Sequence, residues 1–143
     1  MKYETIVKTP PTEEPITIIE ANDQLRLSLG EDHDHVEVLI SAARDTAEKF
    51  CNRYFTEQTV AIVYDSTFSG STLCLPYPDL QSISAIKTYD EEGNETVLDA
   101  GTYSFVSDQK RIYFSTVPTG YATFTVEVVT GAPVEMKSVK AAI

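Results

Sequence analysis

The stretch LPYPDLQSISAIKTYDEEGNETVLDAGTYSF, residues 75–105, decides the fold class of this chain. Pro76 and Pro78 limit ladder pairing where the chain enters a strand, because proline lacks a backbone N–H. Residues 82–89 then predict a strand, and the acidic residues 90–94, which include a glycine, predict a turn into the next one. No arrangement in this stretch is typical of a reaction centre, so its predicted purpose is shape.

Strand-like runs continue on both sides of this stretch. Threonine, tyrosine and valine dominate from residue 59 onward, and these residue types favour strands. Polar residues 107–109 predict a second hairpin connection. The middle of the protein is therefore predicted to be antiparallel β. The predicted strands are 59–65, 72–75, 82–89, 95–98, 103–106, 111–115 and 121–129.

A short helix is predicted before this β region. Thr17 and Glu20 have the T-x-x-E spacing of a capping box, in which each residue satisfies a backbone N–H of the first turn. The helix is expected over residues 18–27. Its predicted apolar contacts are Ile18, Ala21 and Leu25.

A second helix is predicted over residues 34–54, because apolar residues recur there at steps of three and four. The opposite face is charged, and two pairs on it, Arg44 with Glu48 and Asp45 with Lys49, have the i,i+4 spacing of ion pairs along a helix. We expect this face to be exposed. The predicted apolar stripe is Val36, Leu39, Ile40, Ala43, Ala47, Phe50 and Tyr54, and the charged face is Glu37, Arg44, Asp45, Glu48 and Lys49.

The two ends complete the predicted organisation. Residues 1–15 contain three prolines and predict an extended N-terminal arm. Pro133 suits the first turn of a C-terminal helix that begins at about residue 133. The fold class is thus predicted as α+β, with two N-terminal helices, a central antiparallel β domain and the start of a C-terminal helix. Residues 16–143 are expected to form a single domain.

Composition excludes several function classes. The chain of 143 residues has a formal net charge of -11, which disfavours binding to nucleic acid through phosphates. We find no stretch apolar enough for a membrane span and no signal peptide. Cys51 and Cys74 are expected to be free, buried thiols in a reducing compartment, with Cys51 as a packing residue beside the apolar stripe.

The residues offer little chemistry. On a helix, His33 and His35 point in different directions and could not share a metal, whereas in a loop they could bind one weakly; a solvated acidic helix start is the simpler interpretation. The FSGSTL segment, residues 68–73, lacks a nucleophile elbow and suits a turn. The acidic turn at residues 90–95 is too exposed for catalytic acids, and no glycine motif suits a phosphate. We therefore predict no catalysis, no cofactor and no metal.

Three segments, in order, resemble the head-tail connector proteins of long-tailed bacteriophages, also called adaptors or head-completion proteins. The first segment covers the two predicted helices, the second covers the opening stretch, and the third leads from the last strand into a helix. Together they span residues 16–143. The matching residues are Thr17, Glu20, Ala21, Leu25, Arg26 and Leu27; Asp34, Leu39, Ile40, Ala42, Ala43, Arg44, Glu48 and Arg53; Pro76, Pro78, Leu80, Ser82, Ile83, Ile86, Asp90 and Gly93; and Gly131, Val134, Lys137, Ala141 and Ile143.

Two departures accompany the resemblance. Asp79 stands where the family usually has proline, and the family usually continues past the position of residue 143 into a longer C-terminal helix that commonly grips the portal. If the chain is truncated, its portal contact cannot be assigned to any of its 143 residues.

The resemblance implies a structural protein without catalysis. It would form a ring of about a dozen subunits on the portal protein, receive a stopper or tail-completion protein, and let DNA slide through its lumen without sequence-specific binding. Its location would be the head-tail junction of the virion, and the host cytoplasm during assembly. The alternative is a β module that binds carbohydrate or another ligand through tyrosines. The candidate interface residues are Glu37, Arg44, Asp45, Glu48, Lys49, Lys137 and Lys140.

Overall fold

The computed structural model describes residues 2–27, 33–65 and 70–131. The chain divides into two compact units, which we describe separately. The β unit comprises residues 1–10 and 58–131, and the helical unit has its described part in residues 11–27 and 33–57. The α+β class is confirmed. The predicted C-terminal helix lies outside the described residues, and the predicted division into an arm and one domain stays a prediction.

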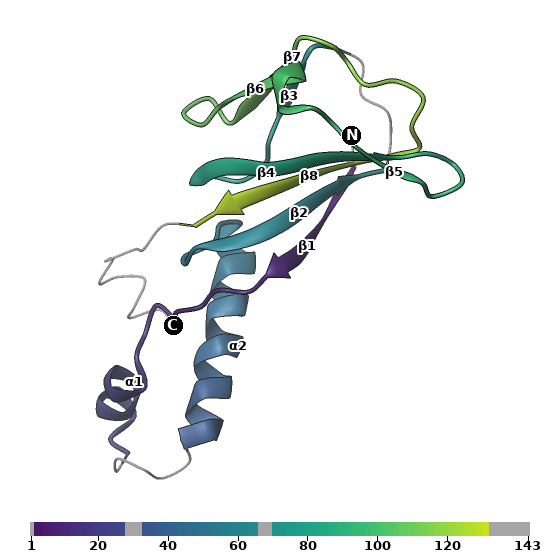
Figure 1. The fold of residues 1–143 in the computed structure, drawn as a ribbon. Helices are drawn as coiled ribbons and strands as arrows, with labels where there is room; N and C mark the ends of the chain where they lie inside the picture. The colour runs from purple at the N-terminus through teal and green to yellow at the C-terminus, as the bar shows by residue number, and fades with distance from the viewer. Residues whose placement is uncertain (1, 28–32, 66–69, 132–143) are drawn as a thin grey trace. The chain divides into compact units, whose positions relative to one another are not determined.

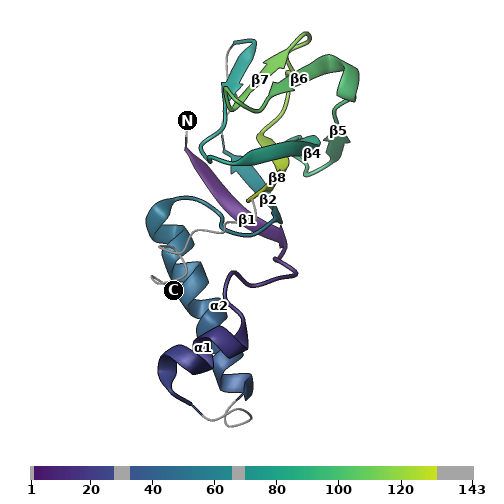
Figure 2. The same ribbon diagram turned by 90° about the vertical axis from the view of Figure 1, so that its left-hand side faces the viewer.

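The β unit contains two antiparallel sheets (Figure 1). The larger has the strand order β1-β2-β8-β4-β5, and the smaller has the order β3-β7-β6. Both views place the smaller sheet over one face of the larger one (Figure 2). The strands are β1 (Tyr3–Thr9), β2 (Gln58–Tyr64), β3 (Thr72–Cys74), β4 (Leu80–Tyr89), β5 (Glu95–Val97), β6 (Tyr103–Val106), β7 (Arg111–Phe114) and β8 (Thr123–Thr130).

An apolar core lies between these sheets. The rings of Phe114 on β7 and Phe124 on β8 meet edge to face, with centroids 6.0 Å apart. Such aromatic pairs and tightly buried β-branched residues suit a pleated surface that is covered on one side. The side chains with at most 5% exposure include Val60, Ile62, Leu73, Ile86, Ile112, Phe114, Phe124, Val126 and Val128.

The first strand closes one edge of the larger sheet. Strand β1 pairs antiparallel with β2, in a register that runs from Tyr3↔Tyr64 to Thr9↔Thr59. The Thr5 hydroxyl and the Tyr77 hydroxyl lie 2.6 Å apart, and the Tyr3 ring contacts that of Tyr64. The extended segment at the chain start is therefore a strand of the β unit.

The opening stretch folds largely as its residues predict. Strand β4 begins at Leu80, two residues earlier than expected, directly after Asp79 takes a left-handed φ of 56°. Gly93 has a φ of 86° in the turn between β4 and β5, where a side chain would be strained. The second predicted hairpin connects β6 and β7.

The helical unit contains α1 (Ile18–Leu25) and α2 (His33–Cys51). The predicted capping box is present, with Thr17 and Glu20 bonded reciprocally. Helix α1 ends before residue 27 because Arg26 takes a left-handed φ of 57°, and its N–H bonds the Asn22 and Asp23 carbonyls. Helix α2 likewise ends before residue 54, because Asn52, directly after its last residue, takes a left-handed φ of 50°.

Candidate interaction surface on the helical unit

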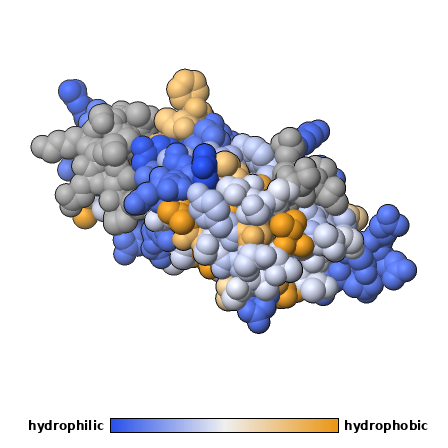
Figure 3. All heavy atoms as spheres, turned by 90° about the horizontal axis from the view of Figure 1, so that it is seen from above, coloured by the Kyte–Doolittle hydropathy of each residue, from blue (hydrophilic) through white to orange (hydrophobic). Residues whose placement is uncertain are grey.

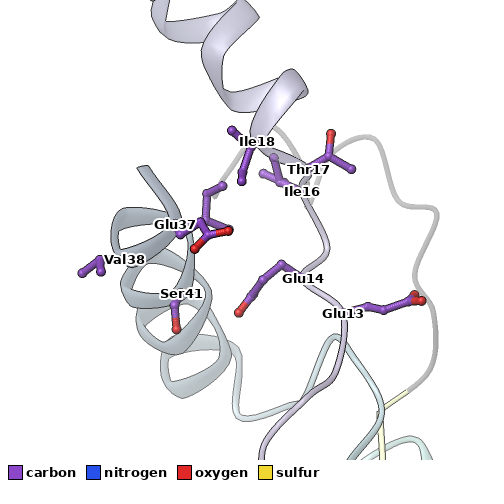
Figure 4. A pocket seen from close by; sticks show the side chains of 9 residues that line it. Glu13, Glu14, Ile16, Thr17, Ile18, Glu37, Val38 and Ser41 are labelled. Carbon is purple, nitrogen blue, oxygen red and sulfur yellow. The ribbon is translucent and has the colours of Figure 1, made fainter. Parts of the chain in front are cut away.

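An open groove of about 760 Å³ lies beside α2 (Figure 4). Its wall on one side is the first half of α2, and on the other it is the segment that leads into α1. Figure 4 shows Glu14 reaching across the groove toward α2, while Val38 and Glu13 point to its outer sides. The groove combines apolar and acidic side chains. Its lining residues are Glu13, Glu14, Ile16, Thr17, Ile18, Glu37, Val38, Ile40 and Ser41.

A buried ion cluster adjoins this groove. The Arg44 Nε donates to Glu14 Oε2 at 2.7 Å, and Arg44 Nη1 donates to Glu48 Oε2 at 3.0 Å and to Asp45 Oδ1 at 2.7 Å. Burial alone lowers the pKa of Arg44, but the hydrogen bond to Glu14 and the three carboxylate charges outweigh it and raise that pKa. The guanidinium therefore stays charged and ties the segment before α1 to α2.

Glu48 extends the cluster to the end of the unit. Its Oε1 accepts a hydrogen bond from the Phe55 N–H at 2.8 Å. The carboxylate thus joins Arg44 to the turn after α2, and it satisfies a buried backbone donor. Sequence spacing predicted the pair between Arg44 and Glu48, but neither the partner Glu14, thirty residues away, nor the Phe55 N–H.

The predicted charged face is wrong in part. Arg44 is 6% exposed and Glu48 5% exposed, so both are buried rather than on an outer face. Glu37, Asp45 and Lys49 are exposed as expected. Lys137 and Lys140 lie outside the described residues. Of the candidate interface set, the described and exposed members are therefore these three.

The predicted apolar stripe of α2 is also only half buried. Val36 and Ile40 are 1% and 7% exposed, whereas Leu39 is 47% and Phe50 91% exposed. The seven predicted residues span a wide arc, whereas the buried residues of α2 are Val36, Ile40, Arg44 and Glu48, at steps of four along one side of the helix. On α1, the expected contact Leu25 is likewise 55% exposed, and Asn22 is the buried residue.

The residues weighed for chemistry form no metal site within the described ranges. His33 lies 3.9 Å from Glu37, one turn along α2, and Glu31 and Asp32 lie outside the described residues. Cys51 and Cys74 are free and exposed, so the expectation of buried thiols is wrong. Within the described ranges, no group of three or more histidine, cysteine or acidic side chains could hold a metal ion.

The exposure of the tyrosines concerns the alternative of a carbohydrate-binding module. Tyr121 is 8% exposed, and Tyr103 and Tyr113 are half-buried, so these rings serve packing more than stacking on a sugar.

No helix in the described part of the chain is long and apolar enough to cross a membrane.

On the β unit, a lysine lies between two carboxylates of the neighbouring strands. Lys87 on β4 lies 3.3 Å from Glu127 and 3.5 Å from Glu95 on the neighbouring strands. The hydrogen bond to Glu127 is the main cause that raises the pKa of Lys87. The face seen in Figure 3 mixes hydrophilic and hydrophobic residues in small groups.

Exposed apolar side chains beside a groove mark a surface that suits contact with another molecule. The chain belongs to the head completion protein family, whose match covers residues 15–143. The resemblance drawn from the sequence is thus confirmed, and with it a structural role in connecting head to tail. No curated protein matches the chain.

Solved structures share this fold. A chain in the neck of an empty gene transfer agent (GTA) particle, computed with C6 symmetry, has a TM-score of 0.65 and 22% identity, with 92% of this chain and 71% of that chain covered. A chain in the native GTA virion has a TM-score of 0.67 and 19% identity, with 89% and 71% covered. A chain in the native neck, computed with C12 symmetry, has a TM-score of 0.61 and 20% identity, with 92% and 70% covered.

Proposed function

We propose that this chain is a subunit of a ring at the head-tail junction of a virion, where it joins the portal protein to a stopper or tail-completion protein. The observation that carries the proposal is the family match over residues 15–143. The neck structures that share the fold were computed with C6 and C12 symmetry, which supports a ring with many identical subunits.

The charge of the chain suits this role. DNA has to pass through such a ring without being held, and lysines that face the lumen would bind its phosphates. The formal net charge of -11 leaves few cations for that purpose. We therefore propose that DNA passes through the lumen and makes no sequence-specific contact.

The role that we propose requires no catalysis. It requires two different faces on each subunit for its neighbours, and further faces for the portal above and the tail component below. We propose that Glu37, Asp45 and Lys49 contribute to these contacts, and that Arg44 and Glu48 contribute by holding α2 in place. Lys137 and Lys140 remain candidates. Assembly would take place in the host cytoplasm before the virion is released.

Electron microscopy of the purified chain mixed with portal rings tests the proposal. We expect an added layer of density on one end of each portal ring, with the rotational symmetry of a ring. Portal rings alone, and portal rings with an unrelated acidic protein, are the controls. Portal rings that stay unchanged at every concentration of the chain would contradict the proposal.

A further inference from the structure

The most exposed apolar side chain in the described residues lies near the end of α2. Phe50 is 91% exposed, and its neighbour Lys49 is exposed as well. An aromatic ring of this kind supplies a large contact area at a small cost in conformational entropy, and such rings are enriched at the centres of protein interfaces. Phe50 therefore offers a contact surface that the described residues leave open.

The groove beside α2 is the matching feature. It has apolar walls from Ile16, Ile18 and Ile40, of which Ile40 is 7% exposed, and it has room for an aromatic ring at about 760 Å³. Three acids surround it, and the Glu37 side chain is 59% exposed. A fitting occupant is apolar with a cation next to it, which describes Phe50 with Lys49 directly before it.

The geometry of a single helix prevents Phe50 from filling its own groove. Phe50 and Ser41 are nine residues apart, and at about 100° per residue they lie about 180° apart around α2. Phe50 also lies about 15 Å along the helix axis from Ile40. One helix thus presents the ring on one side and the groove on the other.

We propose that Phe50 of one copy inserts into the groove between α2 and residues 13–18 of the next copy, with Lys49 facing Glu37 there. This inference rests on the proposed function and names its lateral contact. A contact between two different surfaces of identical subunits passes from copy to copy and closes into a ring when the rotation allows. Acidic surfaces of two copies repel each other, whereas Lys49 attracts the acids of the groove. This attraction therefore also fixes how neighbouring copies are aligned.

The contact is expected to be weak between free copies. A stable interface buries about 1,200–2,000 Å², and one aromatic side chain supplies only about 150–250 Å² of it. We therefore expect free copies to associate weakly, and the portal to gather them so that the contact forms.

Photo-cross-linking tests the contact directly. The full chain carries p-benzoylphenylalanine at position 50, and copies of light and heavy isotope content are mixed, both free at high concentration and bound to portal rings. We expect cross-links between copies that end in residues 13–18 or 37–41. The proposal would be overturned if no cross-link formed. It would also be overturned if cross-links ended only in residues 132–143 of the same copy, in the portal or in other surfaces.

Variants give a second measurement. Phe50→Ser should reduce the fraction of portal rings that carry the added ring by about tenfold or more, as expected for a central aromatic anchor. Because Phe50 is exposed, the variant should keep its circular dichroism spectrum. Val97→Ser is the matched control, since Val97 is 56% exposed on β5 and should leave ring formation unchanged.

A charge exchange tests the register. Lys49→Glu and Glu37→Lys should each reduce ring formation, and the double variant should restore it. If the wild type forms rings on the portal and Phe50→Ser forms them equally well, this contact is contradicted. The proposed function would stand in that case. If the wild type forms no ring on the portal, the proposed function fails, and cross-linking of the free chain alone decides the contact.

Discussion

The two units of this protein are stabilised in different ways. The β unit buries aliphatic and aromatic side chains between two sheets, among them Ile62, Phe124 and Val126 at 0% exposure. The described helical unit buries few large apolar side chains, and its interior includes Arg44, Glu48 and Asn22. The β unit thus carries its own apolar core, whereas the described helical residues bury a network of ion pairs and expose several apolar side chains.

The largest expected effect is in the β unit. Phe124→Ala should lower the free energy of unfolding by about 3–5 kcal/mol, because it removes an aromatic ring from a fully packed core. Chemical denaturation followed by near-ultraviolet dichroism of the tyrosines measures the change. Val97→Ala, at an exposed position, is the control and should change stability by about 0.5 kcal/mol or less. Equal effects of the two substitutions would refute a core between the sheets.

Arg44→Ala should have the next largest effect. It removes the guanidinium that pairs with the buried Glu48, which costs about 3 kcal/mol, at the lower end for broken buried pairs because the Glu14 side chain is 33% exposed. Far-ultraviolet dichroism during denaturation should show the helices melting earlier. Asp45→Ala removes an exposed partner of the same arginine and should have a much smaller effect. Equal stability of the two variants would contradict a stabilising role of the buried ion cluster in the helical unit.

Thr17→Ala tests the start of α1 and should cost about 1 kcal/mol, because the side chain that accepts from the Glu20 N–H is lost. The backbone N–H of Thr17 itself still reaches Glu20. Hydrogen exchange of the amides in α1 measures the change, and Thr17→Ser, which keeps the hydroxyl, should preserve protection. Unchanged exchange in Thr17→Ala would show that the cap adds nothing to this helix.

The smallest expected effect is the loss of stability of the Asp90 turn at low pH. Asp90 accepts hydrogen bonds from the Asn94 side chain and backbone and from the Glu92 N–H, which hold its pKa below the usual value for an aspartate. Its stabilising contribution is therefore present above the pKa of the unfolded chain and is lost as pH falls through the lower folded value. We expect exchange of the amides in the turn to be faster in Asp90→Asn than in wild type at neutral pH, and the difference to shrink in acid. A difference independent of pH would contradict this cause.

The sequence predicts the fold well where one residue type dictates one backbone shape. The capping box at Thr17, the turn at Gly93 and the run rich in valine and threonine at residues 121–129 are of this kind, and the structure has each of them. Local periodicity has less power over burial. It placed Leu39 and Phe50 in a core, because it cannot show how much of the arc of α2 another segment covers.

The candidate surface was predictable only in part. Glu37, Asp45 and Lys49 are identified by their spacing on a helix, since a charged residue opposite an apolar stripe is exposed by default. The groove depends on residues 13–18 lying beside α2, and that depends on the bond between Arg44 and Glu14. No local pattern links residues thirty positions apart, although an isolated arginine among acids on one helix face was a signal for a further carboxylate partner.

The register of β1 and β2 has a consequence for the evolution of this chain. Thr9 pairs with Thr59, so the polypeptide leaves the sheet and re-enters it at neighbouring positions. Residues 11–57 therefore stand in the place of a hairpin loop between two adjacent strands. Such a segment can be lengthened, exchanged or redesigned while the sheet keeps its pairing, because the entropic cost of closing a loop rises only slowly with its length. A lineage could thus change the surface that meets its partners and leave its scaffold untouched.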